Sequence, residues 1–197
     1  TAEDVIFNGT VGQTLDLGAI DITGNLDLNA DIGNTGGTAG AASLAVSGTT
    51  DLGADVTTVG TQTYGGITTV SVASTLATTN SNITFNNTIV GDGGADGLTL
   101  NMGSGIVEFN GAVGGTAIGA IAITGGLNLD AAITSATSLT VSTTSNLGAS
   151  VTTSGVQTYT GNSTLSSNGA LNFTGTTVSF LGTVAGDGGN DEEVTIT

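Results

Sequence analysis

Hydrophobic residues in this chain alternate with polar ones in short runs, and glycines separate the runs. Segments such as "LDL", "IDI", "LAV" and "ITF" place an apolar side chain at every second position, and "TQTY" alternates in the same way between threonines and larger residues. Alternation with a period of two is typical of strands with one buried face, whereas a helix repeats every 3.6 residues. Glycine after these segments supplies the positive φ that sharp corners require. We therefore expect an all-β fold of many short strands.

The same pattern occurs twice along the chain, at an offset of about one hundred residues. "VIFNGTVG" returns as "VEFNGAVG" 102 residues later, and "LGADVTTVGTQTYGG" returns as "LGASVTTSGVQTYTG" 95 residues later. The offset falls because the first copy carries an insertion within "GNTGGTAGAAS", which begins at Gly33. The chain therefore divides into two repeat modules, module A over residues 1–101 and module B over residues 102–197.

A finer repeat of about twenty residues occurs inside each module. "ITGNLDLNADI" resembles "VSGTTDLGADV" 24 residues later, and the counterparts in module B are 18 residues apart. Rungs of this length, each with two or three strands, predict a β-solenoid (a parallel β-helix). About ten rungs at about 4.8 Å would make a rod roughly 48 Å long. The alternative is two tandem β-sandwich domains of the immunoglobulin-like kind, although the lack of Trp and Pro favours the solenoid.

The two ends of the chain are in register with each other. Joined end to start, they read "GDGGNDEEVTIT-TAEDVIFNG", which matches the internal junction "GDGGADGLTLNMGSGIVEFNG". From Gly91 to Phe109 there are 18 steps, and from Gly186 through the join to Phe7 there are again 18. The 197 residues are therefore predicted to be one period of a longer array. The expected partners are further copies of the same repeat, end to end, in a covalent array or a homopolymer.

Composition removes several classes of function. The chain has no Lys, Arg or His against 16 acidic residues, for a formal charge of −16. No cationic side chain can hold nucleic-acid phosphates or an anionic lipid surface, and no apolar run reaches membrane-spanning length. Without His or Cys, no histidine-based triad and no imidazole or thiolate metal site can form. We expect no nucleic-acid binding, no membrane insertion by this segment, no catalysis and no required cofactor.

Several segments resemble the repeats of a known class of surface protein. "VTTVGTQTYGG", "VTTSGVQTYTG", "ITFNNTIVG" and "VEFNGAVGG" resemble the repeat regions of large bacterial adhesins of the filamentous-haemagglutinin and beta-strand-repeat kind. The resemblance covers essentially the whole chain. It implies an exported, extended stalk or fibre located outside the cell or at its surface. It implies no catalytic residues, because none are defined in such repeats.

Acidic, glycine-rich turns occupy the same place in the two modules and are the main candidate for ligand chemistry. Calcium takes six to eight oxygen ligands, and a glycine-rich turn can add main-chain carbonyls to carboxylates. The turns differ from the "GGxGxDxUx" calcium repeat and lack EF-hand spacing, so a solvated turn remains the other interpretation. The candidate calcium ligands are Asp92, Asp96, Asp187, Asp191, Glu192 and Glu193.

The aromatic residues fall at repeat-equivalent or alternating positions, so we expect them in the core. They are Phe7, Tyr64, Phe85, Phe109, Tyr159, Phe173 and Phe180. The leading functional hypothesis is a structural repeat segment of an extracellular filament, fibre or adhesin stalk. The alternative is a calcium- or glycan-binding surface module that uses the acidic turns.

Overall fold

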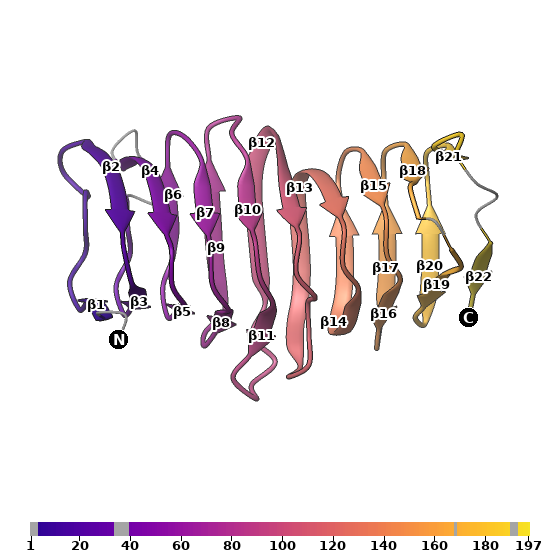
Figure 1. Ribbon diagram of the computed structural model, residues 1–197, viewed down its shortest axis with the longest axis horizontal. Helices are drawn as coiled ribbons and strands as arrows, with labels where there is room; N and C mark the ends of the chain where they lie inside the picture. Colours follow the sequence, from indigo (N-terminus) through magenta and orange to yellow (C-terminus); the bar gives the residue numbers. More distant parts are fainter. Residues whose placement is uncertain (1–3, 34–39, 168, 190–192) are drawn as a thin grey trace.

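The computed structural model describes residues 4–33, 40–167, 169–189 and 193–197 as a rod of stacked coils (Figure 1). It is all-β, and its coils form a β-solenoid of about nine turns. Every strand pairing is parallel. The predicted solenoid is confirmed, and the alternative of two sandwiches is wrong because sandwich sheets are antiparallel. Within these residues, no helix is present that could span a membrane.

The chain forms three sides, which we number by the first strand that the chain contributes to each. Side 1 contains β1 (Asp4–Phe7), β3 (Asn25–Leu28), β5 (Thr50–Leu52), β8 (Thr68–Val70), β11 (Ile89–Gly91), β16 (Val151–Thr153), β19 (Leu171–Thr174) and β22 (Val194–Ile196). Side 2 contains β2 (Leu17–Ile22), β4 (Ala41–Val46), β7 (Gln62–Tyr64), β10 (Ile83–Phe85), β15 (Ser145–Leu147), β18 (Ser163–Leu165) and β21 (Val184–Gly186). Side 3 contains β6 (Val56–Thr58), β9 (Ser74–Thr78), β17 (Val156–Tyr159) and β20 (Thr177–Phe180).

Three longer strands run around corners and so belong to two sides each. β12 (Leu98–Phe109) begins on side 3, β13 (Ile118–Leu129) begins at the corner before side 3, and both end on side 2. β14 (Ile133–Val141) runs from side 1 to side 3. The predicted boundary between the modules, after residue 101, falls inside β12, where the pairing with β13 shifts register. The modules are therefore joined by a continuous strand.

On each side, one inward row with one residue from each coil traces the stacking, and many strands bury a second residue beside it. On side 1 the row is Val5, Leu26, Thr50, Thr68, Ile89, Val113, Ile133, Val151, Phe173 and Ile196. On side 2 it is Ile22, Val46, Tyr64, Phe85, Phe109, Leu129, Leu147, Leu165 and Gly186. On side 3 it is Val11, Ile32, Val56, Leu76, Leu100, Ile123, Val141, Tyr159 and Phe180.

The chain visits sides 1, 3 and 2 in turn and returns to the side 1 row after 18 to 24 residues. Thr50 and Thr68 mark the shorter return, and Leu26 and Thr50 mark the longer one. The variation is absorbed at the corners. Residues 34–39 of the predicted insertion lie outside the described residues, yet the flanking Gly33 and Gly40 lie together, since a Cβ on Gly40 would stand 3.9 Å from Gly33 Cα. The coil therefore closes between these two glycines.

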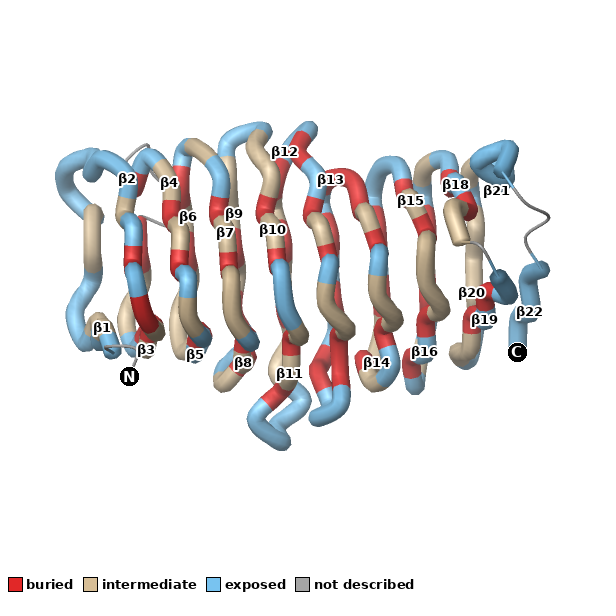
Figure 2. Tube along the Cα trace, in the orientation of Figure 1, coloured by how far each residue is buried: buried red, intermediate tan, exposed pale blue. Residues whose placement is uncertain are grey.

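Aromatic side chains fill the centre of the coils, as predicted. Tyr64, Phe85, Phe109, Tyr159 and Phe173 are fully buried. The rings of Tyr64 and Phe85 stack with centroids 4.9 Å apart, and those of Tyr159 and Phe180 stack at 4.7 Å. Phe7 and Phe180 are half-buried, because they lie in the first and last coils, where one neighbouring coil is missing. Figure 2 shows the same trend, with long exposed stretches in the coils at the two ends.

A buried polar network repeats in the two modules and ties each strand to its corner. The Gln62 amide Nε2 donates to the main-chain oxygens of Ala77 (2.9 Å) and Val56 (3.2 Å), and Tyr64 donates its hydroxyl proton to Gln62 Oε1 (2.9 Å). In module B the Gln157 amide and the Tyr159 hydroxyl make the counterpart bonds. Because the glutamine amide and the tyrosine hydroxyl find hydrogen-bond partners within the protein, both side chains can be buried in the core.

Corresponding residues of the two modules lie on different sides of the rod. Counted by inward residues, the chain after Phe7 passes Val11, Ile22, Leu28, Ile32, Val46, Leu52, Val56, Tyr64, Val70, Leu76, Phe85, Ile89, Leu100 and Phe109. A module is therefore fourteen sides long, which at three sides a coil makes four coils and two further sides. As a result, Tyr64 lies on side 2 whereas its counterpart Tyr159 lies on side 3. Every residue of module B is displaced by one side from its counterpart in module A.

Burial raises the pKa of Tyr64 and Tyr159 well above the ordinary value near 10. The neutral phenol is therefore favoured by the folded state, and its contribution is fully present below pH 10. Above pH 10 the unfolded chain ionises first, and stability falls by about 1.4 kcal/mol per pH unit for each tyrosine. Unfolding followed by circular dichroism from pH 8 to 12 should show this loss.

The double variant Tyr64→Phe, Tyr159→Phe should be less stable at pH 8, because two glutamine oxygens lose their donor, yet lose little more as the pH rises. The chain has no Lys, Arg or Cys that titrates in this range, so a difference between the variant and the parent protein reports the two tyrosines. An equal alkaline loss in the variant and the parent protein would contradict the assignment.

Candidate functional site

The acidic turn of module A, which we call turn A (residues 91–97), links β11 to β12. Asp92 Oδ1 accepts a hydrogen bond from Gly94 N at 2.8 Å, and Gly93 takes a φ of 112°. The carboxylates of Asp92 and Asp96 both lie against Gly94, where a Cβ would meet them. Two of the predicted calcium ligands are thus brought together over one glycine, with Asp92 exposed and Asp96 half-buried.

The acidic turn of module B, turn B (residues 186–193), begins in the same way. Asp187 Oδ1 accepts from Gly189 N at 2.8 Å, and Gly188 takes a φ of 87°. Asp191 and Glu192 lie outside the described residues. Glu193 is exposed, and its main-chain oxygen accepts from Leu171 N at 2.8 Å, which binds the end of the turn to the coil below.

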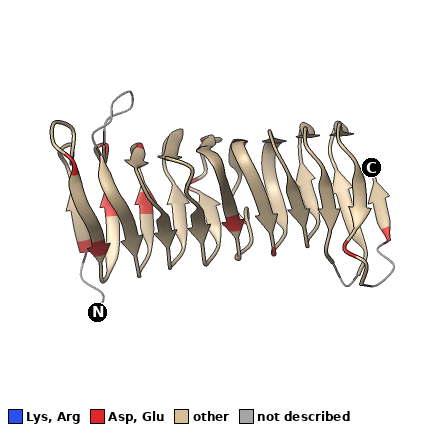
Figure 3. Ribbon diagram, turned by 90° about the horizontal axis from the view of Figure 1, so that it is seen from above, with Lys and Arg blue, Asp and Glu red and all other residues tan. Residues whose placement is uncertain are grey.

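The two turns do not form a common site. Turn A follows β11 on side 1, whereas turn B follows β21 on side 2, and β11 and β21 lie at opposite edges of the rod in Figure 1. Within the residues that the structure describes, no three acidic side chains come together in a group that could hold a metal ion. Figure 3 shows acidic segments over the first coils as well as at the turns.

A second feature is a shallow groove that occurs once in each module and that the sequence interpretation missed. Groove A, on side 1, has a volume of about 260 Å³ and is lined by Asp4, Asn25, Leu26, Asp27, Thr49, Thr50, Asp51 and Thr69. Groove B, on side 2, has a volume of about 360 Å³ and is lined by Ile106, Glu108, Gly126, Leu127, Asn128, Thr144, Ser145, Asn146 and Thr164.

The two grooves are the same site in the two modules. Each of the eight residues of groove A has its counterpart in groove B, at an offset of 102 for Asp4, of 101 for the next three and of 95 for the last four. Among these substitutions, Asp27 becomes Asn128 and Asp51 becomes Asn146. The duplicated groove therefore carries three acids in module A, whereas in module B two of these positions carry amides and the third, that of Asp4, carries Ile106.

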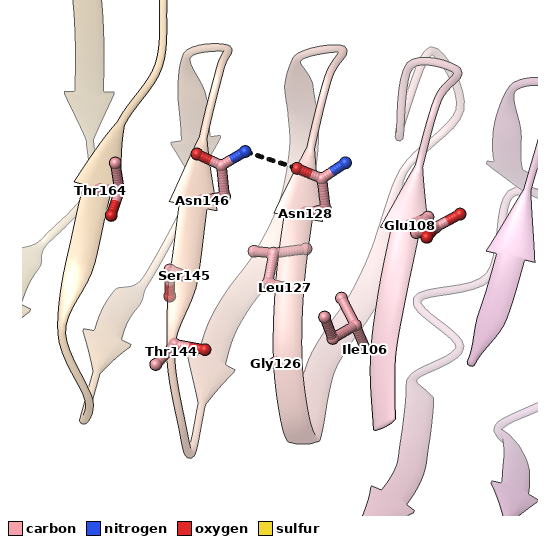
Figure 4. Close-up of a pocket in the computed structure, with 9 residues that line it drawn as sticks. All are labelled: Ile106, Glu108, Gly126, Leu127, Asn128, Thr144, Ser145, Asn146 and Thr164. Carbon is pink, nitrogen blue, oxygen red and sulfur yellow. Dashed lines mark hydrogen bonds between the residues drawn. The ribbon is translucent and has the colours of Figure 1, made fainter. Parts of the chain in front are cut away.

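Groove B contains a glycine, Gly126, where groove A has Asn25. Gly126 leaves a notch between Ile106 and Thr144, each of which would lie within 3.4 Å of a Cβ at this position. Above the notch, Asn146 Nδ2 donates to Asn128 Oδ1 at 2.7 Å, so the two amides join neighbouring coils (Figure 4). This groove offers amide donors and acceptors beside the apolar Ile106 side chain.

Glu108 lies at the rim of groove B and is engaged with the preceding coil. Its carboxylate accepts hydrogen bonds from Thr84 Oγ1 at 3.1 Å and from Asn82 Nδ2 at 3.4 Å. In Figure 4 the Glu108 side chain points away from the two asparagines. The Glu108 carboxylate therefore lies at the edge of groove B and not beside the two amides.

Groove A carries its carboxylates on directly paired residues. Asp27 and Asp51 occupy the same outward position on β3 and β5, one strand spacing of about 4.8 Å apart. Ser71 Oγ donates to Asp51 Oδ1, and Asn25 Nδ2 donates to Asp4 Oδ1 at 2.8 Å. With no cationic side chain in the protein, hydroxyl and amide donors are the groups that oppose the repulsion between these acids. The groove is suited chemically to attract cations.

Sequence reasoning could have found this pair of acids. The 24-residue repeat that aligns "ITGNLDLNADI" with "VSGTTDLGADV" places Asp27 over Asp51 and Asp31 over Asp55. In the structure the second pair is joined by a hydrogen bond, because Asp31 Oδ1 accepts the main-chain N–H of Asp55 at 3.1 Å. This bond links the two neighbouring coils.

The sequence matches no protein-family model, and searches of curated proteins and of solved structures found no match either.

Replacing one acid of groove A with its module B counterpart should stabilise the rod. In Asp51→Asn the amide can donate to Asp27 as Asn146 donates to Asn128, and the like-charge pair is removed. Directly opposed like charges cost about 0.2–1 kcal/mol, so the midpoint of thermal unfolding should rise in low salt. The gain should shrink in 0.5 M salt, at a Debye length of about 4 Å, because salt screens exposed charges.

The matched control is Asp130→Asn, which removes one exposed charge of module B outside the groove. An equal rise for both variants would mean that overall charge, and not the pair in groove A, is responsible.

Proposed function

We propose that this protein is a structural repeat segment of an extracellular filament, fibre or adhesin stalk, and that it performs no catalysis. The observation that carries the proposal is the continuity of the two modules. Module B continues the three sides of module A without a break, through a shared strand and a shared apolar core. Repetition of such a module lengthens a rod and adds no separate domain.

The direction of the hydrogen bonds supports a mechanical role. In parallel pairing the bonds run from one coil to the next, which is along the long axis of the rod. A force that pulls on the two ends of the rod is shared among the hydrogen bonds of three sides in each coil. It is also resisted by the continuous packing of the inward rows. A rod of this kind is suited to hold a terminal domain at a distance.

An extracellular place is supported by the resemblance to bacterial surface repeats and by the surface charge. The net charge of −16 is unopposed by any basic residue, so neighbouring rods repel one another in low salt. The absence of Lys and Arg also leaves no cleavage site for trypsin-like proteases in this segment.

Labelling of intact cells tests the proposed function. An antibody raised against residues 1–197 should bind intact cells of the source organism about as strongly as permeabilised cells. Negative-stain images of a fusion of three copies should show one unbroken rod. Labelling that appears only after permeabilisation would contradict the extracellular role, and a string of separate globules would contradict the rod.

Cation binding at turn A is a second candidate function, favoured by the convergence of Asp92 and Asp96 on Gly94. Main-chain carbonyls and water would complete a calcium shell around the two carboxylates. Calorimetric titration of the full chain with calcium should then show a saturable heat that the double variant Asp92→Asn, Asp96→Asn lacks and Asp130→Asn retains. Equal heats in the parent protein and the double variant would exclude turn A as the site.

A further inference from the structure

We infer that copies of this chain stack end to end, with each copy turned by one side of the solenoid relative to the copy before it. The inference rests on the proposed role as a segment of a tandem array, and it specifies the surfaces that meet. The two surfaces are the open strand edges at the ends of the rod, and the occupant of each is a second copy of this chain.

The junction between modules A and B provides the template. There, Phe85 packs on Phe109 with ring centroids 5.7 Å apart, Ile89 pairs with Val113, and Leu100 pairs with Ile123. All six side chains are at most 2% exposed. The three contacts lie on sides 2, 1 and 3, so together they close one complete coil.

The C-terminal end of the rod carries the residues that correspond to the module A half of this junction. Phe180, Val184 and Ile196 are the counterparts of Phe85, Ile89 and Leu100. Val184 and Ile196 are 46% and 55% exposed, because no further coil covers them. An exposed edge of parallel strands with apolar inward residues is a surface that pairs readily with another strand.

The N-terminal end carries the residues that correspond to the module B half of the junction. Phe7, Val11 and Ile22 are the counterparts of Phe109, Val113 and Ile123. Phe7 and Val11 are half-buried and pack against the core from one side only. The two ends thus carry the two halves of a contact that the protein already makes within itself.

Matching the ends on this template places Phe180 on Phe7, Val184 on Val11 and Ile196 on Ile22 of the next copy. All three contacts agree on one rotation. Phe180 lies on side 3 but Phe7 on side 1, Val184 lies on side 2 but Val11 on side 3, and Ile196 lies on side 1 but Ile22 on side 2. Each side of the next copy therefore continues the neighbouring side of the copy before it.

The length of chain at the join favours this rotation over an unrotated stack. In a covalent array, five residues separate Ile196 from Val5 of the next copy, and six residues separate Leu100 from Val107 inside the chain. Five residues can turn one corner, as the internal six do. They cannot reach side 1 again, because a return to the same side takes 18 to 24 residues.

The count of sides gives the geometry of the array. From Phe109 the chain passes Val113, Ile123, Leu129, Ile133, Val141, Leu147, Val151, Tyr159, Leu165, Phe173, Phe180, Val184, Ile196 and then Phe7 of the next copy. This is again fourteen sides, so a whole copy has nine coils and one further side. At about 4.8 Å a coil, each copy adds about 45 Å, and the same orientation returns every three copies, after about 135 Å.

Cysteine cross-linking in a fusion of two full copies tests the contact. Thr195 and Asp21 are exposed outward neighbours of the apolar contacts, so Thr195→Cys in the first copy should form a disulfide with Asp21→Cys in the second. The internal counterpart pair, Thr99→Cys with Ala122→Cys in a single copy, is the matched control, because these residues are directly paired on β12 and β13. The natural chain has no cysteine, so the loss of free thiols on mild oxidation reports each pair directly.

We expect the two pairs to cross-link to a similar extent. Thr195→Cys with Asp4→Cys of the second copy should stay reduced, because this pair comes together only if side 1 continues as side 1, with Ile196 over Val5. A disulfide in that pair, or none in either pair while the internal control forms, would overturn the inference. Surface labelling does not depend on the stacking, so failure of the stacking is distinguishable from failure of the proposed function.

Discussion

The hydrogen bonds between coils are the interaction on which the rest of this structure depends. Most strands have only three or four residues, and a strand of that length is not stable alone or in a single pair. Each strand is held because its neighbours lie directly above and below, one coil away. That arrangement requires the coil to close, whatever the number of residues in it. The corners meet this requirement, as Gly33 and Gly40 do when they close the coil across the inserted residues.

Close stacking also explains the glycine content. At the corner after Tyr64, a Cβ on Gly66 would run into the main-chain carbonyl of Gly48 in the coil below, and Gly161 has the same relation to Thr143. The carbonyls of one coil thus approach the next as closely as backbone allows. Asparagine side chains complete several of these contacts from the outside, as when Asn110 donates to Asn86 at 3.0 Å. The high glycine content is therefore a direct requirement of the stacking.

The sequence was sufficient to predict the solenoid and the buried aromatic rows, because both depend on periodicity alone. It could not give the three-sided cross-section, since an alternating run such as "TQTY" says which side chains point inward but not where the chain turns next. For the same reason it could not show that Tyr64 and Tyr159 lie on different sides, which needs a count of corners. The pairing of Asp27 with Asp51 was predictable from the 24-residue repeat, whereas the groove around them depends on side-chain packing. Turn A was predicted with its two aspartates, whereas their convergence on Gly94 depends on local backbone angles.

The length of the module has a consequence for how rods avoid one another. Fourteen sides and three sides to a coil have no common factor, so each chemical pattern moves around the rod and does not accumulate along one face. Lateral association of stacked strands into dry, zipper-like sheets requires identical side chains in register over a long distance. A fibre built from this module would offer any neighbour only short stretches of matching surface, interrupted by a change of side at every module. Strand stacking would thus extend the filament along its axis while its flanks stay mismatched, which keeps a fibre made of β-strands from becoming a sheet.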